Sequence, residues 1–159
     1  KRQFFDIFIV DAFLGNFDRH GANWGFLKKD GKYTLAPVFD NGSCLYPAMV
    51  DEGEMQAVMN DESEIDRRVY DFPTSQILLR GRKSSYFQVI SSLRFQEVNK
   101  ALERIYPRID LDSIVRLIES VSILSPIHRK FYETMIRARY DKILRFSYER
   151  LKEARNEDL

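Results

Sequence analysis

The first segment of the chain is hydrophobic at almost every position. After Gln3, only Asp6 and Asp11 interrupt the apolar run that extends to residue 14. An apolar pattern on nearly every side is typical of a helix that is buried all round. Gly15 and Asn16 then supply the left-handed or turn conformations that end a helix. We therefore predict a buried helix over residues 3–14, followed by the polar segment GNFDRHGANWGF.

The pattern changes to two short apolar runs on either side of Asp30 and Gly31. An Asp-Gly pair between such runs is the strongest local signal for a β-hairpin. If these two residues form the turn, Lys29 pairs with Lys32 and this register extends back along both strands. Pro37 indicates that the second strand is short or lies at an edge.

The predicted hairpin brings polar side chains together at its open end. Its register places Asn23 opposite Val38, with Asp40 two residues further along. Diagonal neighbours across a ladder lie ~7–8 Å apart, within reach of one another's side chains. Asp18 lies in the segment that leads into the same end. Three oxygen-bearing side chains are therefore expected to converge where the buried helix ends.

The rest of the chain divides into a poorly patterned stretch and a helical one. Residues 49–83 contain an acidic run at 51–66 and a Pro73-Thr74 pair that could open a short helix. We expect surface segments here, with the acidic run facing solvent and mobile. From residue 85 the apolar spacing is helical. The expected helices lie within residues 85–93, 94–106, 110–121 and 125–159, the last with Ser125 as its cap and Pro126 at its first position.

This pattern predicts a mainly α domain with one small β-hairpin. We divide the single domain, residues 1–159, into a loop-and-hairpin part (1–48), a variable part (49–84) and a helical part (85–159). The chain has 159 residues, of which 44% are hydrophobic, enough to build a core. Lysine and arginine nearly balance the acids, leaving a net charge of +1. Direct nucleic-acid binding and attraction to an acidic membrane are therefore not expected.

A single cysteine, Cys44, excludes an internal disulfide and a multi-thiolate metal site. A reducing compartment, the cytoplasm, is the better interpretation. Because Asp6 and Asp11 interrupt the apolar start, we do not interpret it as a signal peptide or membrane span. We interpret Cys44 as a packing residue and the two acids as residues that brace the loop or face solvent.

The three converging side chains suggest a reaction type. One amide and one carboxylate suit Mg²⁺, which keeps several waters and takes further ligands from substrate phosphates. A third carboxylate nearby can accept a proton from a hydroxyl. A base within reach of a metal-bound phosphate is the arrangement used for phosphoryl transfer.

These residues resemble a known family. Asp18 and Asn23 have the spacing of the protein-kinase catalytic loop, and Asp40 in FDNG follows a hairpin as the metal-binding kinase aspartate does. The order DRHxxN differs from that of ordinary protein kinases. GNFDRHGANWGFL together with LAPVFDNGSCLYP resembles the HipA-like serine/threonine kinases, the toxins of bacterial toxin–antitoxin pairs. The resemblance is strongest over residues 4–48.

The resemblance implies a kinase-like C-terminal lobe with ATP as phosphoryl donor and Mg²⁺ as cofactor. Asp18 would be the catalytic aspartate, and Asn23 and Asp40 would bind the metal and, through it, the nucleotide. Supporting roles are implied for Arg19 and His20, which would orient the loop, and for Asn41 and Gly42, which would shape the metal-binding turn.

The same resemblance implies partners. The substrate would be a protein with a serine or threonine hydroxyl, and an antitoxin would be a further partner. The chain starts at Lys1 without the Gly-rich loop and strand lysine that hold nucleotide phosphates. We expect an N-terminal lobe, or a partner that supplies it, to provide those parts. The chain alone should bind ATP weakly and turn over poorly.

Several alternatives remain open at this point. Type II phosphatidylinositol 4-kinases have a similar DRxxxNW loop, which makes a lipid kinase the nearest alternative. A non-catalytic interaction domain derived from a kinase is another. Individually, His20 is more often structural than catalytic, and Arg19 could pair with a buried acid. The basic residues at 80–83 are interpreted as a solvated loop.

Overall fold

The computed structural model describes residues 2–157, and most of these residues are helical. The α-helices are α1 (Arg2–Leu14), α2 (Glu52–Met59), α3 (Glu62–Asp66), α4 (Tyr86–Ser91), α5 (Gln96–Ile105), α6 (Leu111–Ser120), α7 (Pro126–Arg139) and α8 (Phe146–Glu157). Short 3-10 or π segments complete the helical part: η1 (Gly21–Asn23), η2 (Arg67–Asp71), η3 (Tyr106–Arg108) and η4 (Tyr140–Arg145). The strands are β1 (Phe26–Lys29), β2 (Lys32–Leu35), β3 (Thr74–Leu79) and β4 (Arg82–Ser85).

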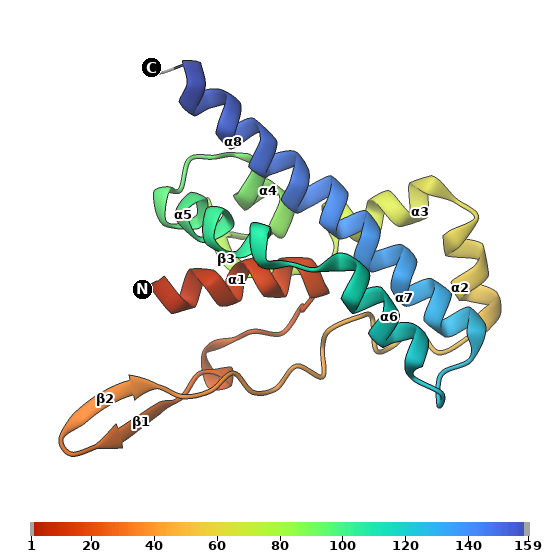
Figure 1. The fold of residues 1–159 in the computed structure, drawn as a ribbon, viewed down its shortest axis with the longest axis horizontal. Coiled ribbons are helices and arrows are strands. Elements are labelled where there is room, and N and C mark those ends of the chain that lie inside the picture. The colour runs from red at the N-terminus through yellow and green to blue at the C-terminus, as the bar shows by residue number, and fades with distance from the viewer. Residues whose placement is uncertain (1, 158–159) are drawn as a thin grey trace.

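Helix α1 confirms the prediction for the start of the chain, and it lies across the middle of the fold (Figure 1). It packs against α5 and α7, and Ile9 and Ala12 are fully buried. Gly15 ends the helix with φ of +68°, a conformation that L-residues rarely adopt. The expectation of burial on all sides is wrong at Phe4 and Val10, which are exposed. Phe4 stacks on Trp24, whereas Val10 lines a groove beside α5 and α6.

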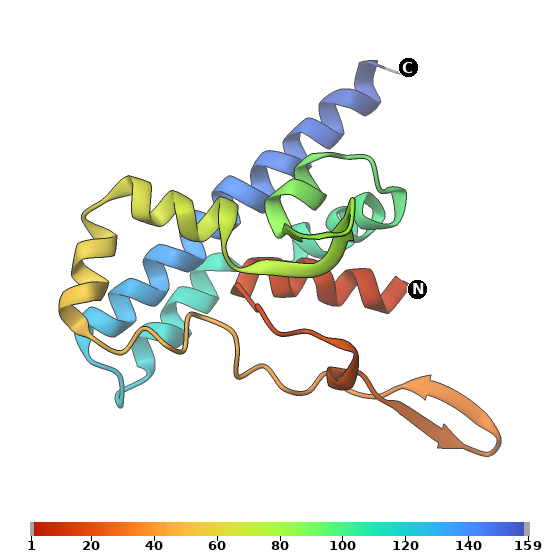
Figure 2. The same cartoon turned by 180° about the vertical axis from the view of Figure 1, so that it is seen from behind.

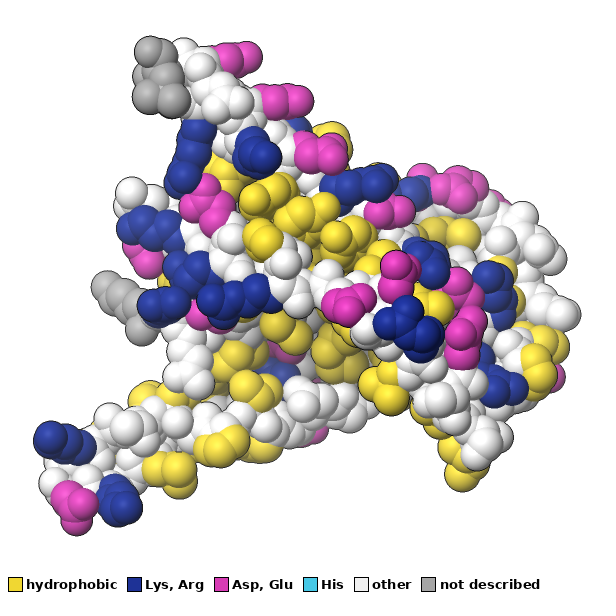
Figure 3. All heavy atoms as spheres, in the orientation of Figure 1, with side chains coloured by type: hydrophobic (Ala, Val, Ile, Leu, Met, Phe, Trp, Pro, Cys, Tyr) yellow, Lys and Arg dark blue, Asp and Glu magenta, His cyan; other side chains and the backbone are white. Residues whose placement is uncertain are grey.

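The first hairpin has the predicted turn and register. Lys29 pairs with Lys32 and Phe26 with Leu35, and the Ala36 amide donates to the Gly25 carbonyl at 2.8 Å. Hairpin β1–β2 projects from the helical body as an arm (Figures 1 and 2). Its charged tip and the hydrophobic side chains along its length are visible in Figure 3. Phe26 and Tyr33 are exposed aromatic residues of this arm.

The prediction of a variable loop region over residues 49–84 is wrong because the acidic run is helical, although most of its acidic side chains face solvent as expected. Asp51 and Asp61 accept hydrogen bonds from main-chain amides at the starts of α2 and α3, as N-cap residues do. Acidic residues in the first turn of each helix stabilise it, because their negative charge lies near the positive end of the helix dipole. Met55, Val58 and Ile65 on these helices are buried in the core. The acidic residues therefore cap and surround the N-termini of two helices that pack into the core.

The structure also corrects two other expectations: it has a second hairpin, and a strand rather than a short helix follows Pro73. Thr74 begins strand β3, which pairs antiparallel with β4 in a second hairpin. Arg80 and Gly81 form its turn, both with positive φ, at 52° and 76°. Two consecutive positive φ values are the signature of the tight hairpin turn that fits twisted strands.

The predicted helical part is confirmed. Helices α4, α5 and α6 lie within their expected ranges, and α7, η4 and α8 form one continuous rod (Figure 1). Ser125 caps α7 and Pro126 occupies its first turn, as expected. No helix within residues 2–157 has the length and apolar character needed to cross a membrane.

Candidate active site

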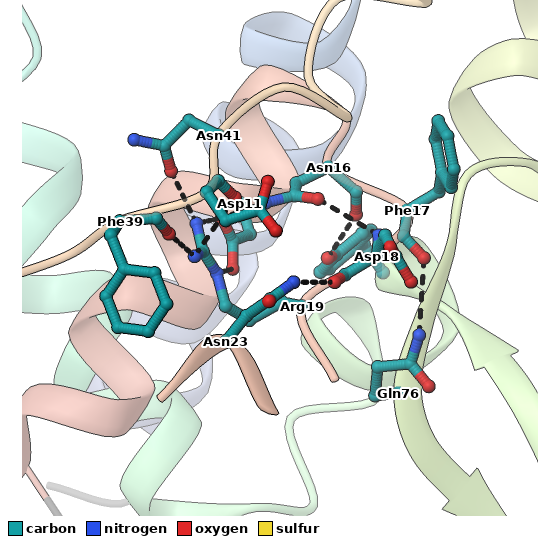
Figure 4. Close-up of polar contacts among 11 residues, drawn as sticks. Asp11, Asn16, Phe17, Asp18, Arg19, Asn23, Phe39, Asn41 and Gln76 are labelled. Carbon is teal, nitrogen blue, oxygen red and sulfur yellow. Dashed lines mark hydrogen bonds and ion pairs between the residues drawn. The ribbon is translucent and has the colours of Figure 1, made fainter. Parts of the chain in front are cut away.

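The segment that links α1 to the first hairpin is held by its own polar side chains. The residue that follows the helix-ending glycine, Asn16, is fully buried and uses both ends of its side chain. Its Nδ2 donates to Asp11 Oδ1 at 3.0 Å, and its Oδ1 accepts from the main-chain amide of Asp18 at 3.0 Å (Figure 4). The main chain at Asp18 is thus tied to the last turns of α1.

Arg19 forms a buried ion pair with Asp11. Its Nε and Nη2 donate to the two carboxylate oxygens, each at 3.0 Å (Figure 4). The side chains of Arg19 and Asp11 are only 6% and 4% exposed. The hydrogen bond to Asp11 raises the pKa of Arg19, against the opposing effect of burial. The expectation that Arg19 pairs with a buried acid is confirmed, as is the bracing role of Asp11.

The same guanidinium connects the two loops that carry the candidate residues. Arg19 Nη1 donates to the Phe39 carbonyl at 2.5 Å, and Nη2 donates to Asn41 Oδ1 at 2.6 Å. These two acceptors lie on either side of Asp40 in the sequence. A longer contact, 3.4 Å, reaches the carbonyl of Asp40 itself. The loop with Asp18 and the turn with Asp40 are therefore joined through one buried side chain (Figure 4).

Asp18 has a fixed main chain and an accessible side chain. Its carbonyl accepts from Asn23 Nδ2 at 2.7 Å and from the His20 amide at 2.8 Å. Its side chain is 46% exposed, with His20 Nε2 lying 3.7 Å from Oδ2. His20 Nδ1 accepts from the Ala22 amide at 3.1 Å and caps η1. Because Nδ1 is an acceptor, the neutral imidazole carries its proton on Nε2, facing the carboxylate.

Asp40 and its neighbours form an exposed turn. Asp40 has φ of +54°, and its side chain is open to solvent. Asn41 connects back to Arg19, and its carbonyl accepts from the Cys44 amide at 3.1 Å, which closes the turn. A Cβ at Gly42 would have Asp40 Oδ1 at 3.9 Å as its nearest neighbour, so no steric crowding requires glycine there.

Asn23 and Asp40 suit a magnesium ion better than a transition metal. Asn23 is buried, and its hydrogen bond to Asp18 uses the amide nitrogen, which leaves the amide oxygen as the possible ligand. Within residues 2–157, no group of three or more His, Cys, Asp or Glu side chains is arranged to hold a metal. A pair of protein oxygens is enough for Mg²⁺, whose other ligands are waters and substrate phosphates.

Asn23 and Val38 were expected opposite each other, and both line one small cavity together with Arg19 and Phe39. The strands pair only as far as Phe26 and Leu35, so the ladder itself stops short of them. The open end of the hairpin is nevertheless next to the loop, as predicted.

The sequence interpretation missed two residues that hold the loop. Asn16 was predicted only to help end the helix, whereas its side chain also holds the main chain of Asp18. Tyr86, 70 positions away, donates its hydroxyl to the Asn16 carbonyl at 2.6 Å. The predicted packing role of Cys44 fits its half-buried position, where burial raises the pKa of its thiol to about 11.

Comparison with known proteins gives two related matches. The chain is 39% identical over 155 residues to the serine/threonine-protein kinase CtkA of Helicobacter pylori strain J99, covering 94% of this chain and 47% of that protein. It superposes on the crystal structure of CtkA, described as a proinflammatory kinase, with a TM-score of 0.88 over 96% of this chain and 53% of that one. The sequence matches no protein-family model.

The chain is therefore homologous to CtkA over almost all its residues, and it has the fold of the matching part of that kinase. It spans about half the length of CtkA. The mainly helical, kinase-related fold expected from the sequence is thus supported.

Proposed function

We propose that this chain is the catalytic C-terminal half of a HipA-like serine/threonine kinase, which transfers the γ-phosphoryl group of ATP to a protein hydroxyl. The observation that carries the proposal is the bridge made by Arg19. It ties the loop of Asp18 to the turn of Asp40. Homology to a protein described as a serine/threonine kinase supports the reaction class. The order DRHxxN supports the HipA-like assignment.

Asp18 is the base in this proposal. Its main chain is held by hydrogen bonds on both sides, while the carboxylate is nearly half exposed and free to meet an acceptor. As the acceptor oxygen attacks the γ-phosphorus, Asp18 takes the hydroxyl proton and ADP leaves with the electron pair of the broken P–O bond. His20 Nε2 lies 3.7 Å from Asp18 Oδ2, beyond hydrogen-bond distance, so that His20 supports the loop through its bond from the Ala22 amide.

Asn23 and Asp40 are the metal ligands in this proposal. The donor set fits Mg²⁺: Asn23 bonds to the main chain of Asp18, Asp40 lies in the turn that Arg19 joins to that loop, and within residues 2–157 the Asp40 carboxylate forms no ion pair. When bound, Mg²⁺ neutralises charge on the transferring phosphates. The parts that hold the nucleotide from the other side, a Gly-rich loop and a strand lysine, would come from an N-terminal lobe or a partner.

The proposal is tested in the full-length protein by Mg²⁺-dependent phosphorylation with radiolabelled ATP. Asp18→Asn should lower the rate by at least about 100-fold, the usual contribution of a general base. Asp40→Asn should raise the Mg²⁺ concentration needed for half-maximal activity. Asp30→Asn is the matched control. Asp30 is an exposed aspartate in the turn of the β1–β2 hairpin; its φ of +49° is close to that of Asp40, and its variant should keep normal activity.

Normal Mg²⁺-dependent activity in both Asp18→Asn and Asp40→Asn would show that the assignment is wrong. Phosphorylation of phosphatidylinositol vesicles, with no transfer to protein, would favour the lipid-kinase alternative instead.

A further inference from the structure

Tyr86 lies at the base of the loop that carries Asp18, although it belongs to the helical half of the chain. It is the first residue of α4 and is 2% exposed. Its hydroxyl donates to the main-chain carbonyl of Asn16 at 2.6 Å, across 70 positions of sequence. This contact lies outside the groups that take part in the proposed reaction.

The position of the Tyr86 ring is determined on several sides. Ser85 and Gln88 form a capping box, which fixes where α4 begins. The ring packs against Phe8 with centroids 5.1 Å apart, and the Arg139 guanidinium lies 5.9 Å from its centroid. Burial raises the pKa of the phenol, so the hydroxyl keeps its proton and remains a donor.

Asn16 passes this restraint directly to Asp18. The Asn16 carbonyl accepts from Tyr86, its amide N–H donates to the Asp11 carbonyl at 3.0 Å, and its side chain bonds Asp11 and the Asp18 amide. All four polar groups of Asn16 are thus used inside the protein. The Tyr86 hydroxyl is therefore one bond away from the residue that holds the main chain of the proposed base.

On the side facing β3 the loop has a ring contact, that of Phe17 with Phe72, whose centroids are 5.8 Å apart. A cavity of about 250 Å³ lies there, lined by both sides of the gap: Gly21, Trp24 and Arg19 from the loop region, Ile77 from β3, and Tyr86. In addition to the ring packing, hydrogen bonds from Tyr86 and Gln76 reach the main chain of the loop. Of these, the bond from Tyr86 is short and fully buried, whereas that from Gln76 Nε2 to the Phe17 carbonyl is 3.3 Å long and only partly buried.

We infer that Tyr86 is a positioning residue for the proposed base: its hydroxyl holds Asn16, and through Asn16 it holds Asp18 in the geometry needed for proton transfer. This inference rests on the proposed kinase function. It also gives the helical half of the chain a specific task in the reaction.

The test removes a single oxygen atom. Tyr86→Phe keeps the ring against Phe8 and deletes only the donor to Asn16. In the full-length protein, kcat for Mg²⁺-dependent phosphorylation should fall about tenfold, because small displacements of a catalytic group cost up to about 100-fold. The KM for MgATP should stay within about twofold of the original, since the variant removes no proposed nucleotide or metal contact.

Tyr46→Phe is the matched control. Tyr46 is also buried, and its hydroxyl also donates to a main-chain carbonyl, that of Arg68 at 2.8 Å. That carbonyl is outside the Asp18 loop. The control should therefore lose stability without the drop in kcat. An equal drop in both variants would overturn the inference, because it would reflect a general loss of packing.

A second readout does not depend on activity. In the unmodified protein the main-chain N–H of Asp18 donates a hydrogen bond to Asn16 Oδ1, so the exchange of this amide hydrogen with solvent deuterium should be slow. Tyr86→Phe should speed exchange at Asp18 by about tenfold, and Tyr46→Phe should leave it unchanged. If the original protein transfers no phosphoryl group, the proposed function fails and the exchange measurement alone decides the role of Tyr86.

Three further results overturn the inference: unchanged exchange at Asp18, an unchanged kcat in an active protein, or failure of Tyr86→Phe to fold. The last would show that the hydroxyl serves the whole fold rather than the loop.

Discussion

Replacing Asp11 by asparagine measures how strongly one buried ion pair holds the candidate site together. Asp11 accepts both hydrogen bonds that Arg19 directs into α1, each 3.0 Å long, and a third from Asn16. Asp11→Asn keeps the size of the side chain but removes its charge. Whichever oxygen the new amide nitrogen replaces, it faces an N–H of Arg19, so that two donors meet.

The expected loss of stability follows from burial. Breaking one partner of a buried ion pair typically costs about 3–5 kcal/mol, because the remaining charge stays desolvated. Arg19 keeps its bonds to the Phe39 carbonyl and Asn41, which places the loss toward the lower end of that range. With a urea slope of about 2 kcal/mol per M, a loss of about 3 kcal/mol lowers the unfolding midpoint by about 1.5 M.

Asp6→Asn provides the control on the same helix. Asp6 also accepts from an arginine, Arg104, at 2.7 Å, but the two side chains are 24% and 21% exposed. Partly exposed pairs contribute about 0–1 kcal/mol. Urea unfolding of each variant can be followed by the fluorescence of Trp24, the single tryptophan, which stacks on Phe4 at the start of α1. Losses that differ by less than about 1 kcal/mol between the two variants would refute the reasoning.

Two further predictions concern single positions near the site. Gly15→Ala should lower the free energy of unfolding, measured with urea, by about 1–2 kcal/mol because φ is +68° there. The control, Gly21→Ala, should change it by less than about 0.5 kcal/mol, since Gly21 has no positive φ and a Cβ there meets no atom within 4 Å. The Cys44 thiol, with its pKa raised from 9.0 to about 11, should react slowly with iodoacetamide at pH 8 and faster as the pH approaches 11. The unfolded chain loses this proton first, so the thiol's contribution to stability is full below pH 9 and is lost between pH 9 and about 11, as unfolding curves at pH 8 and 10.5 would show.

Local signals explain why much of the fold could be predicted. The apolar run before Gly15 and the Asp30-Gly31 turn each act over a few neighbouring residues, and both led to the correct element. The second hairpin carries a similar signal in Arg80-Gly81, but β4 has the sequence RKSS, with no hydrophobic alternation to mark a strand. Pro73 before it favoured a helix start. The strand was therefore hidden by its polar residues, although Ser84 and Ser85 are buried in the fold.

The acidic helices were missed for a different reason. The acids of residues 51–66 were interpreted together as a solvated run, which obscured the apolar Met55, Val58 and Ile65 between them. Asp51 and Asp61 are N-cap residues, so acidity marks the helix starts here. Composition averaged over a window cannot distinguish a cap from a solvated charge, whereas the position of each acid relative to the next apolar residue can.

The candidate site divides along the same line between local and distant contacts. Asp18, Asn23 and Asp40 could be proposed because their spacing follows one loop and one hairpin, whose register is a local property. The residues that hold these three side chains in place cannot be predicted from local spacing. Asp11 reaches Arg19 across the end of a helix, and Tyr86 reaches Asn16 from another half of the chain.

Both of these contacts also use ordinary residues in ordinary patterns, an acid within an apolar helix and a tyrosine at a helix start. Tyr86 adds a bond to a main-chain carbonyl, which any residue at position 16 would offer, so no residue type at the acceptor records the pairing. The reacting groups of a loop can therefore be inferred from sequence spacing. The groups that position them become visible only when the chain is folded. The Asp11→Asn and Tyr86→Phe variants test this division directly, since each leaves the three proposed reacting side chains unchanged.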